Sequence, residues 1–94
     1  MNEKKIIAAR KLLIDYLANL AKKKGVSQQW IADASGIPRP HVNRFFSGTT
    51  NPTLDTFIKV SDALGVFLFV IDKSDDSDIA ESMRKRWTRK GDKN

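Results

Sequence analysis

The window from Gln28 to Ser47 constrains the fold more than any other part of the chain. In QQWIADASGIPRPHVNRFFS, residues with little or no side chain, Ala32 and Gly36, stand where two helices would touch and bend. Two helices that cross steeply through a tight turn need little bulk at their contact and a positive φ at the bend. Apolar residues recur at spacings that face inward from both helices, namely Ile31, Ile37, Val42 and Phe45. The window therefore predicts two short helices joined by a tight turn.

The second of these helices has an unusual start. Pro38 stands roughly at its N-cap, and Pro40 lies in its first turn. The first N–H groups of a helix have no partner inside the helix, so a proline there removes no helical hydrogen bond, and its fixed φ already suits a helix. The prolines thus mark the beginning of a helix over about Arg39–Phe46, with Arg39 at its tip. The sequence does not explain why the usual Ser or Thr cap is missing.

The segments on either side of the window predict two more helices. Residues 3–24 carry apolar side chains at every third or fourth position, Ile6, Ala9, Leu13, Leu17 and Leu20, and Gly25 is a natural stop. The lysines at 22–24 suit the negative end of the helix dipole, a role that competes with contact to phosphate. Thr53 is a suitable cap for a helix over residues 54–64, whose apolar face contains Leu54, Phe57, Ile58, Val60 and Leu64.

After Gly65 the pattern changes to VFLFVID, which is rich in aromatic and β-branched residues and lacks helical periodicity. It predicts a β-strand over residues 66–72. No other segment resembles a partner strand, and an unpaired apolar strand would expose its backbone donors and acceptors. We therefore expect antiparallel pairing with the same strand of a second copy, through Phe67, Leu68, Phe69, Val70 and Ile71. The alternative is a short extended segment packed on its own domain.

The last part of the chain differs in composition from the rest. An acidic stretch, DKSDDSD, is followed by a basic one in which Ile79, Met83 and Trp87 form a narrow apolar stripe at helical spacing. Such a stripe is too narrow to hold a helix in place alone. We expect residues 1–72 to form one domain that includes the strand, and residues 73–94 to form a flexible charged tail, with or without a short helix.

The composition favours a polyanionic partner. The 94 residues include 17 Lys and Arg against 11 Asp and Glu, a net charge of +6, which suggests nucleic acid first and an anionic membrane second. With no cysteine and one histidine, His41, no metal or cofactor site is expected. The chain contains no nucleophile paired with a base and no glycine-rich phosphate loop, so we expect no enzyme. The apolar runs are far below the ~20 residues that span a bilayer, which predicts a cytoplasmic protein.

The region from Gly25 to Val66 resembles the Cro/C1-type, or XRE, family of helix-turn-helix proteins. The resemblance lies in SQQ-x-IA-x-x-SGI and in SG-x-x-x-P-x-L-x-T-x-x-K-x-x-x-ALGV. Ser35 departs from the pattern, which usually has an apolar residue there. Together with the predicted strand, the resemblance implies an all-α fold: a compact lambda-repressor-like domain of four or five helices, with one C-terminal β-strand that pairs across a dimer.

The resemblance also implies a site, in which the second helix of the motif enters the DNA major groove. The positions that would face the bases are Arg39, Pro40, His41, Asn43 and Arg44. Arginine pairs with guanine, asparagine with adenine, and a proline ring can pack on a thymine methyl group. The positions that would contact phosphate are Gln28 and Gln29 at the start of the first helix of the motif, and Ser47, Thr49, Thr50 and Asn51 after the second.

Other interpretations remain open for several of these residues. Trp30, Phe45 and Phe46 are more typical of a core than of base stacking, and His41 is also compatible with an ordinary exposed position. The resemblance implies a homodimeric repressor on a palindromic operator. The strand and the tail with Trp87 are also similar to HipB-type antitoxins, which repress their own operon and bind a toxin protein. A third hypothesis is a protein-interaction adaptor that uses the helix-turn-helix only as a scaffold.

Overall fold

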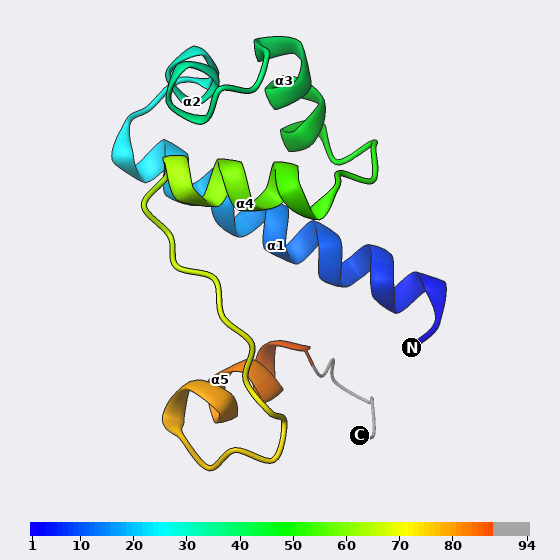
Figure 1. Ribbon diagram of the computed structural model, residues 1–94. Coiled ribbons are helices and arrows are strands. Elements are labelled where there is room, and N and C mark those ends of the chain that lie inside the picture. Colours follow the sequence, from blue (N-terminus) through cyan, green and yellow to red (C-terminus); the bar gives the residue numbers. More distant parts are fainter. Residues whose placement is uncertain (88–94) are drawn as a thin grey trace.

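The computed structural model describes residues 1–87 and is helical, as the sequence predicts (Figure 1). Within these residues the chain forms five helices: α1 (Glu3–Lys24), α2 (Gln28–Ser35), α3 (Arg39–Ser47), α4 (Leu54–Ala63) and α5 (Asp78–Trp87). The end of the predicted tail, residues 88–94, lies outside the described residues, and so does the side chain of Trp87. The all-α fold class is confirmed, and no helix in the described part is long and apolar enough to cross a membrane.

Local side chains and one backbone conformation explain where the central helices begin and end. Ser27 caps α2 by accepting a hydrogen bond from the N–H of Trp30 at 3.0 Å, and Thr53 caps α4 by accepting from Thr56 at 3.2 Å. Gly36 ends α2 with φ +75°, a left-handed conformation that an L side chain rarely adopts. The bend between α2 and α3 therefore depends on this glycine, as the sequence predicts.

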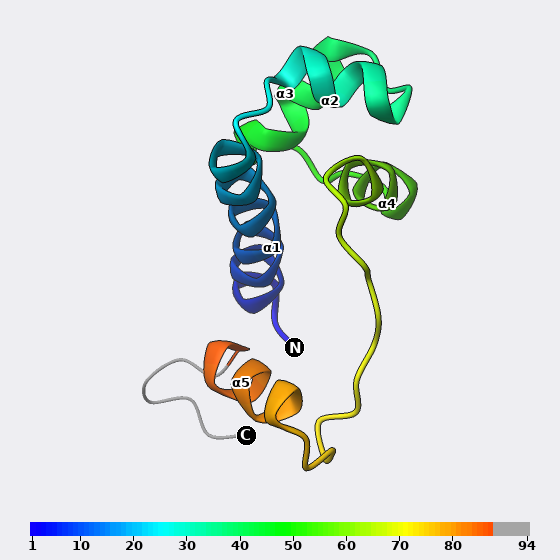
Figure 2. The same cartoon turned by 90° about the vertical axis from the view of Figure 1, so that its left-hand side faces the viewer.

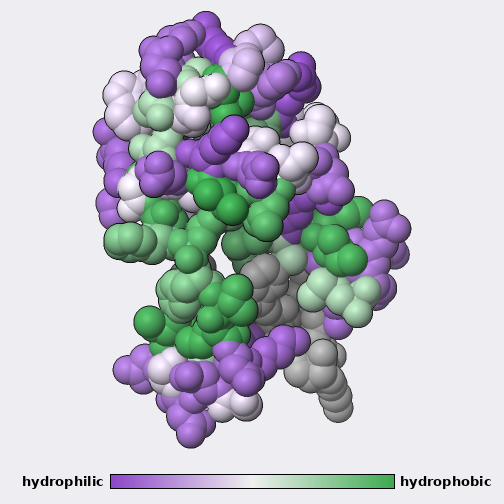
Figure 3. All heavy atoms as spheres, viewed as in Figure 1, coloured by the Kyte–Doolittle hydropathy of each residue, from purple (hydrophilic) through white to green (hydrophobic). Residues whose placement is uncertain are grey.

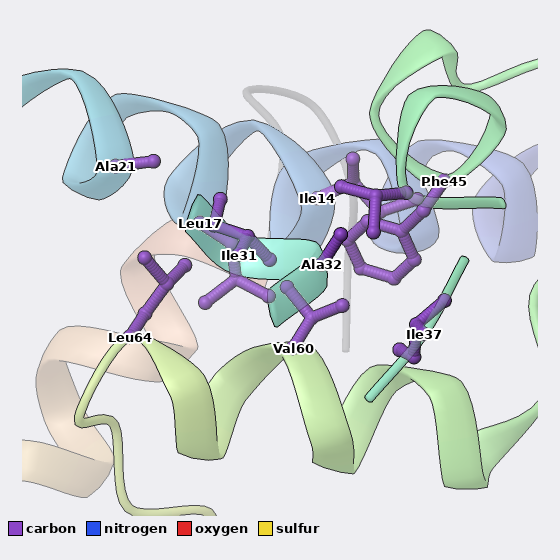
Figure 4. Close-up of a cluster of buried hydrophobic side chains, with 10 residues drawn as sticks. Ile14, Leu17, Ala21, Ile31, Ala32, Ile37, Phe45, Val60 and Leu64 are labelled. Carbon is purple, nitrogen blue, oxygen red and sulfur yellow. The ribbon is translucent and has the colours of Figure 1, made fainter. Parts of the chain in front are cut away.

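The hydrophobic core lies where α2 meets α3 and α4, and where α1 meets α3 (Figure 4). Phe45 of α3 is buried at this junction and contacts two other rings, that of Phe46 edge-on at 5.0 Å between centroids and that of Phe57 at 6.1 Å. All four residues that the window directs inward are buried: Ile31, Ile37, Val42 and Phe45. The predicted packing of the two short helices is therefore confirmed.

The predicted apolar stripe of α1 is buried over only part of its length. Only the second half of the helix packs on the body, through Ile14, Leu17 and Ala21, while Ile6 and Leu13 remain 46% and 41% exposed. The N-terminal half of α1 extends beyond α4 (Figure 1), so no helix of the body covers it. Part of the predicted apolar face of α4 is also exposed. Its C-terminal half is buried, whereas Leu54 in its first turn is 72% exposed.

Residues 66–71 leave the body as an extended segment that runs from α4 to α5 in both views (Figure 2). The N–H of Val66 still bonds to the carbonyl of Ser61 at 2.9 Å, but Phe67 to Ile71 make no hydrogen bond within residues 1–87. Phe67 is 95% exposed and Val70 is 99% exposed. Val66 still packs against the core, but Phe67 and Val70 do not pack on the domain, and the segment pairs with no strand in the described part of the chain. Pairing with a second copy stays a prediction.

Residues 72–87 form a small unit stabilised by local hydrogen bonds. Backbone and side-chain hydrogen bonds from Ser74 lower the pKa of Asp72, and side-chain and backbone hydrogen bonds from Ser77 lower the pKa of Asp75. Ser77 also caps α5, because its hydroxyl accepts from the N–H of Ala80 at 3.2 Å. Arg84 of α5 donates to the carbonyls of Lys73 and Asp75, at 2.6 Å and 2.8 Å. These bonds fold the acidic stretch back onto α5.

Candidate nucleic-acid interface

The turn between α2 and α3 is held by hydrogen bonds from Ser35, the residue that departs from the family pattern. Its hydroxyl donates to the carbonyl of Ala32 at 3.5 Å and accepts from the N–H of Ile37 at 3.3 Å. Ile37 itself is buried in the core. Ser35 therefore replaces an apolar contact at the bend with two hydrogen bonds that position α3.

The prolines at the start of α3 explain why this helix needs no side-chain cap. Pro38 is the N-cap and offers no side-chain hydrogen bond, unlike the Asn, Ser or Thr that precedes each of the other helices in residues 1–87. However, Pro40 has no N–H, and the N–H of His41 already donates to the carbonyl of Pro38 at 2.9 Å. Among the first three residues of α3, only Arg39 retains an unpaired N–H in the described structure.

The outer face of α3 is exposed and basic. All five residues that the sequence assigns to base contacts are exposed: Arg39, Pro40, His41, Asn43 and Arg44. Neither arginine forms an ion pair within residues 1–87, and α3 has no acidic residue. Arg39 lies at the N-terminal tip, whereas Arg44 lies in the last turn, where its charge also suits the helix dipole.

One hydrogen bond joins the predicted base-contact and phosphate-contact groups. The side-chain amide of Asn43 donates from Nδ2 to Oε1 of Gln28, at 3.1 Å, across the junction of α2 and α3. Gln28 is half-buried and Asn43 is exposed. Both residues are predicted to contact DNA, but their hydrogen bond is not predictable from the sequence, because nothing local relates two amides that are 15 residues apart.

The remaining predicted phosphate contacts are exposed but already partly bonded. Gln29 donates from Nε2 to the carboxylate of Asp33 at 2.9 Å. In the loop after α3, the hydroxyl of Ser47 donates to the carbonyl of Arg44 at 2.7 Å, so the 2.9 Å contact between Ser47 and Thr49 uses the hydrogen of Thr49. Thr50 donates to the same carbonyl at 3.4 Å. These hydroxyl hydrogens order the loop, whereas the side chain of Asn51 makes no hydrogen bond in the described residues.

Two side chains differ in role from the sequence expectation. Trp30 was expected in the core but is 47% exposed, because it lies about 100° around α2 from Ile31, which faces the core. Lys24, at the end of the lysine run, donates to the carbonyl of Leu64 at 2.6 Å and so ties the end of α1 to the end of α4. This role differs from both roles considered for the lysines, the dipole effect and the phosphate contact. It could not be predicted from local sequence, because the two residues are 40 positions apart.

Residues 17–67, which are more than half of the 94-residue chain, match the family model described as helix-turn-helix. The chain belongs to the Cro/C1-type helix-turn-helix family. The helix pair α2 and α3, with its exposed basic face, is the motif that gives this family its name. The match places the chain in a family of DNA-binding transcriptional regulators.

Two curated relatives carry related names. An uncharacterized HTH-type transcriptional regulator of Haemophilus influenzae is 34% identical over 62 residues, which cover 66% of this chain and 63% of that protein. A second one, from Sinorhizobium fredii, is 33% identical over 57 residues, which cover 61% of this chain and 74% of that protein. The chain thus spans less than two thirds of the Haemophilus protein. No solved structure matches it significantly.

Proposed function

We propose that this protein is a homodimeric transcriptional repressor that binds a specific double-stranded DNA operator in the cytoplasm. The observation that carries the proposal is the outer face of α3, where two arginines without an acidic partner in the described structure lie beside other exposed polar groups. A basic surface of this kind on a helix-turn-helix suits insertion into the DNA major groove.

In the proposed complex, the two ends of the contact surface have different tasks. Arg39 at the tip of α3 pairs with guanine, Asn43 pairs with adenine, and Pro40 packs on a thymine methyl group. His41 and Arg44 complete the face toward the bases. Gln28, Gln29 and the loop residues Ser47, Thr49, Thr50 and Asn51 hold phosphates, which fixes the register of α3 but does not read sequence. The loop hydroxyls must exchange their internal hydrogen bonds for phosphate, so we expect Gln28 and Asn51 to contribute most.

The exposed segment 66–71 supports the proposed dimer. Five consecutive residues, Phe67 to Ile71, leave their backbone groups without partners in residues 1–87, and both faces of the segment are apolar. Antiparallel pairing with a second copy would satisfy these groups and cover the exposed side chains. A two-fold dimer places its two α3 helices on half-sites ~34 Å apart, which suits a palindromic operator. Bound across a promoter, such a dimer excludes the polymerase.

The proposal is tested by reversing charge on α3. The double variant Arg39→Glu/Arg44→Glu should lose binding to a labelled random-sequence duplex at ~50 mM salt. The control Lys4→Glu/Lys11→Glu changes the net charge equally on α1 and should bind far better. Wild-type log affinity should also fall linearly with log salt up to ~200 mM. Equal losses in both double variants, or an affinity indifferent to salt, would rule out this DNA surface and favour the adaptor hypothesis.

The antitoxin hypothesis is a second candidate, and one observation favours it. The segment after residue 72 folds into α5, which buries Ala80 but leaves Ile79 54% exposed, so the proposed tail offers one exposed apolar side chain on a helix. On this hypothesis residues 1–72 bind DNA and pair with a second copy, while residues 73–94 contact a toxin. Co-purification with the product of a neighbouring gene would support it. Normal growth after deletion of this gene alone, with the neighbour intact, would count against it.

A further inference from the structure

The bond between Asn43 and Gln28 is the only hydrogen bond between side chains that joins α2 to α3 within residues 1–87. It has a direction, because Nδ2 of Asn43 is the donor and Oε1 of Gln28 is the acceptor. The partners also differ in freedom. Gln28 is half-buried at the first position of α2, whereas Asn43 is exposed in the middle of α3. The half-buried side chain thus accepts from the exposed one.

We propose that Gln28 is a specificity-determining positioning residue, which sets the orientation of the Asn43 amide before DNA is bound. The inference deepens the proposed function and rests on it. The terminal torsion of a free asparagine has two broad orientations that exchange its oxygen and nitrogen, and only one suits a given base. The bond from Nδ2 to Gln28 selects one of them. Asn43 therefore meets the groove with a preset donor and acceptor.

The preset orientation matches adenine. Gln28 uses one hydrogen of Nδ2, while the second Nδ2 hydrogen and Oδ1 make no hydrogen bond in the described structure. A base contact to adenine requires one N–H to donate to N7 and one carbonyl oxygen to accept from the N6 amino group. Asn43 retains one N–H and its carbonyl oxygen, so its hydrogen bond to Gln28 does not compete with base recognition. It removes the unproductive orientation and reduces the rotamer entropy that binding would otherwise lose.

The same bond couples base recognition to phosphate contact. Because Oε1 of Gln28 accepts from Asn43, its Nε2 remains free to donate to a phosphate at the start of α2. A phosphate held there would in turn fix Gln28 and hence Asn43. The neighbouring Gln29 offers a matched comparison, because its Nε2 donates to Asp33 of the same helix and does not contact α3. Residues of the same type therefore have different expected effects on sequence preference.

The test is selection of preferred duplexes from a random pool with five proteins: the wild type, Asn43→Ala, Gln28→Ala, Gln28→Glu and Gln29→Ala. We expect Asn43→Ala to lower the preference for adenine at one position of each half-site by roughly tenfold, the discrimination of one good base contact. Gln28→Ala should lower the preference at that same position by roughly threefold. Gln28→Glu should keep it, because a carboxylate still accepts from Nδ2, although its charge lowers affinity for all duplexes. Gln29→Ala should lower affinity for all duplexes, through its proposed phosphate contact, and leave the preference at this position unchanged.

Three results would overturn the inference. Gln28→Ala with an even loss over all sequences would show that Gln28 contacts phosphate only. Equal loss of the adenine preference in Gln28→Glu and Gln28→Ala would show that acceptance from Asn43 is not what matters. If Asn43→Ala leaves the adenine preference unchanged, Asn43 does not contact that base and Gln28 has no base-reading group to position. A wild-type protein that enriches no sequence would instead overturn the proposed function, and this inference with it. Circular dichroism confirms that each variant is folded.

Discussion

The helical body of α1 to α4 and the segment from Phe67 to α5 satisfy their chemical groups in different ways. In the body, helix starts are capped or need no cap, and ten apolar residues from four helices and one turn form a single core. In residues 67–71 of the segment, backbone groups have no partner in residues 1–87 and aromatic side chains face solvent. Figure 3 shows apolar atoms gathered between the body and α5.

The body thus pairs and buries its groups within one chain, whereas residues 67–71 leave theirs without partners in residues 1–87. An exposed contiguous apolar surface on a monomer commonly marks an interaction site. The body provides the α3 face and the segment provides the proposed contact to a second copy, so the two regions divide recognition and assembly between them. Substitutions in the core of the body should therefore change the free energy of unfolding, and substitutions in the segment should change dimerisation.

The largest expected effect is on the free energy of unfolding. It should appear when a buried ring is removed from the body, but not when an exposed ring is removed from the segment. Phe45→Ala should lower the free energy of unfolding by about 3–5 kcal/mol, because Phe45 is 2% exposed and its removal leaves a cavity in the core. Phe67→Ala should change it by less than ~0.5 kcal/mol at concentrations where the chain is monomeric, because that ring is 95% exposed. Denaturant titration measures both. Similar losses in the two variants would contradict the proposed difference between the regions.

The second expected effect is weaker dimerisation with no change in the fold of the body. Phe69→Asp places like charges near the proposed two-fold axis and should weaken the dimer by at least roughly tenfold. Analytical ultracentrifugation measures this change, and circular dichroism should show unchanged helix content. Leu54→Asp is the matched control, since Leu54 is also exposed but lies on α4. A Phe69→Asp protein that dimerises like the wild type would place the dimer contact elsewhere.

The third effect tests the junction between the two regions. Lys24→Met removes the 2.6 Å hydrogen bond to the carbonyl of Leu64, just before the extended segment begins. We expect a loss of about 1 kcal/mol in the free energy of unfolding, a typical net value for one hydrogen bond. Lys23→Met removes the same charge without this bond and should cost less. Equal midpoints in thermal unfolding of the two variants would mean that the contact contributes nothing.

The smallest effect is a gain of stability inside the body. The hydroxyl of Ser61 in α4 is buried and has no hydrogen-bond partner in the described structure. Ser61→Ala removes this unsatisfied group and adds helix propensity, so the free energy of unfolding should rise by about 0.5–1 kcal/mol. A lower unfolding midpoint would show that the hydroxyl stabilises the native protein.

The sequence predicted features that depend on neighbouring residues. Gly36 ends α2 because the required φ is a property of one residue, and the prolines locate the start of α3 for the same reason. Burial of α1 was predicted less well, because periodicity identifies an apolar face but not how much of its length a partner covers. The contacts Lys24 to Leu64 and Gln28 to Asn43 were missed, because they arise only when distant helices pack together. Ser35 departs from the family pattern in the sequence, but its two hydrogen bonds could not be predicted without the geometry of the turn.

The central claim is that a dimer joined by residues 66–71 reads DNA through two copies of α3. The most direct measurement is enrichment of duplexes from a random pool by the wild-type protein, with the mass of the resulting complex determined in solution. We expect an inverted repeat with half-site centres about one helical turn or a multiple of it apart, bound by two chains. An unrepeated enriched sequence bound by one chain, or no enrichment at all, would contradict it.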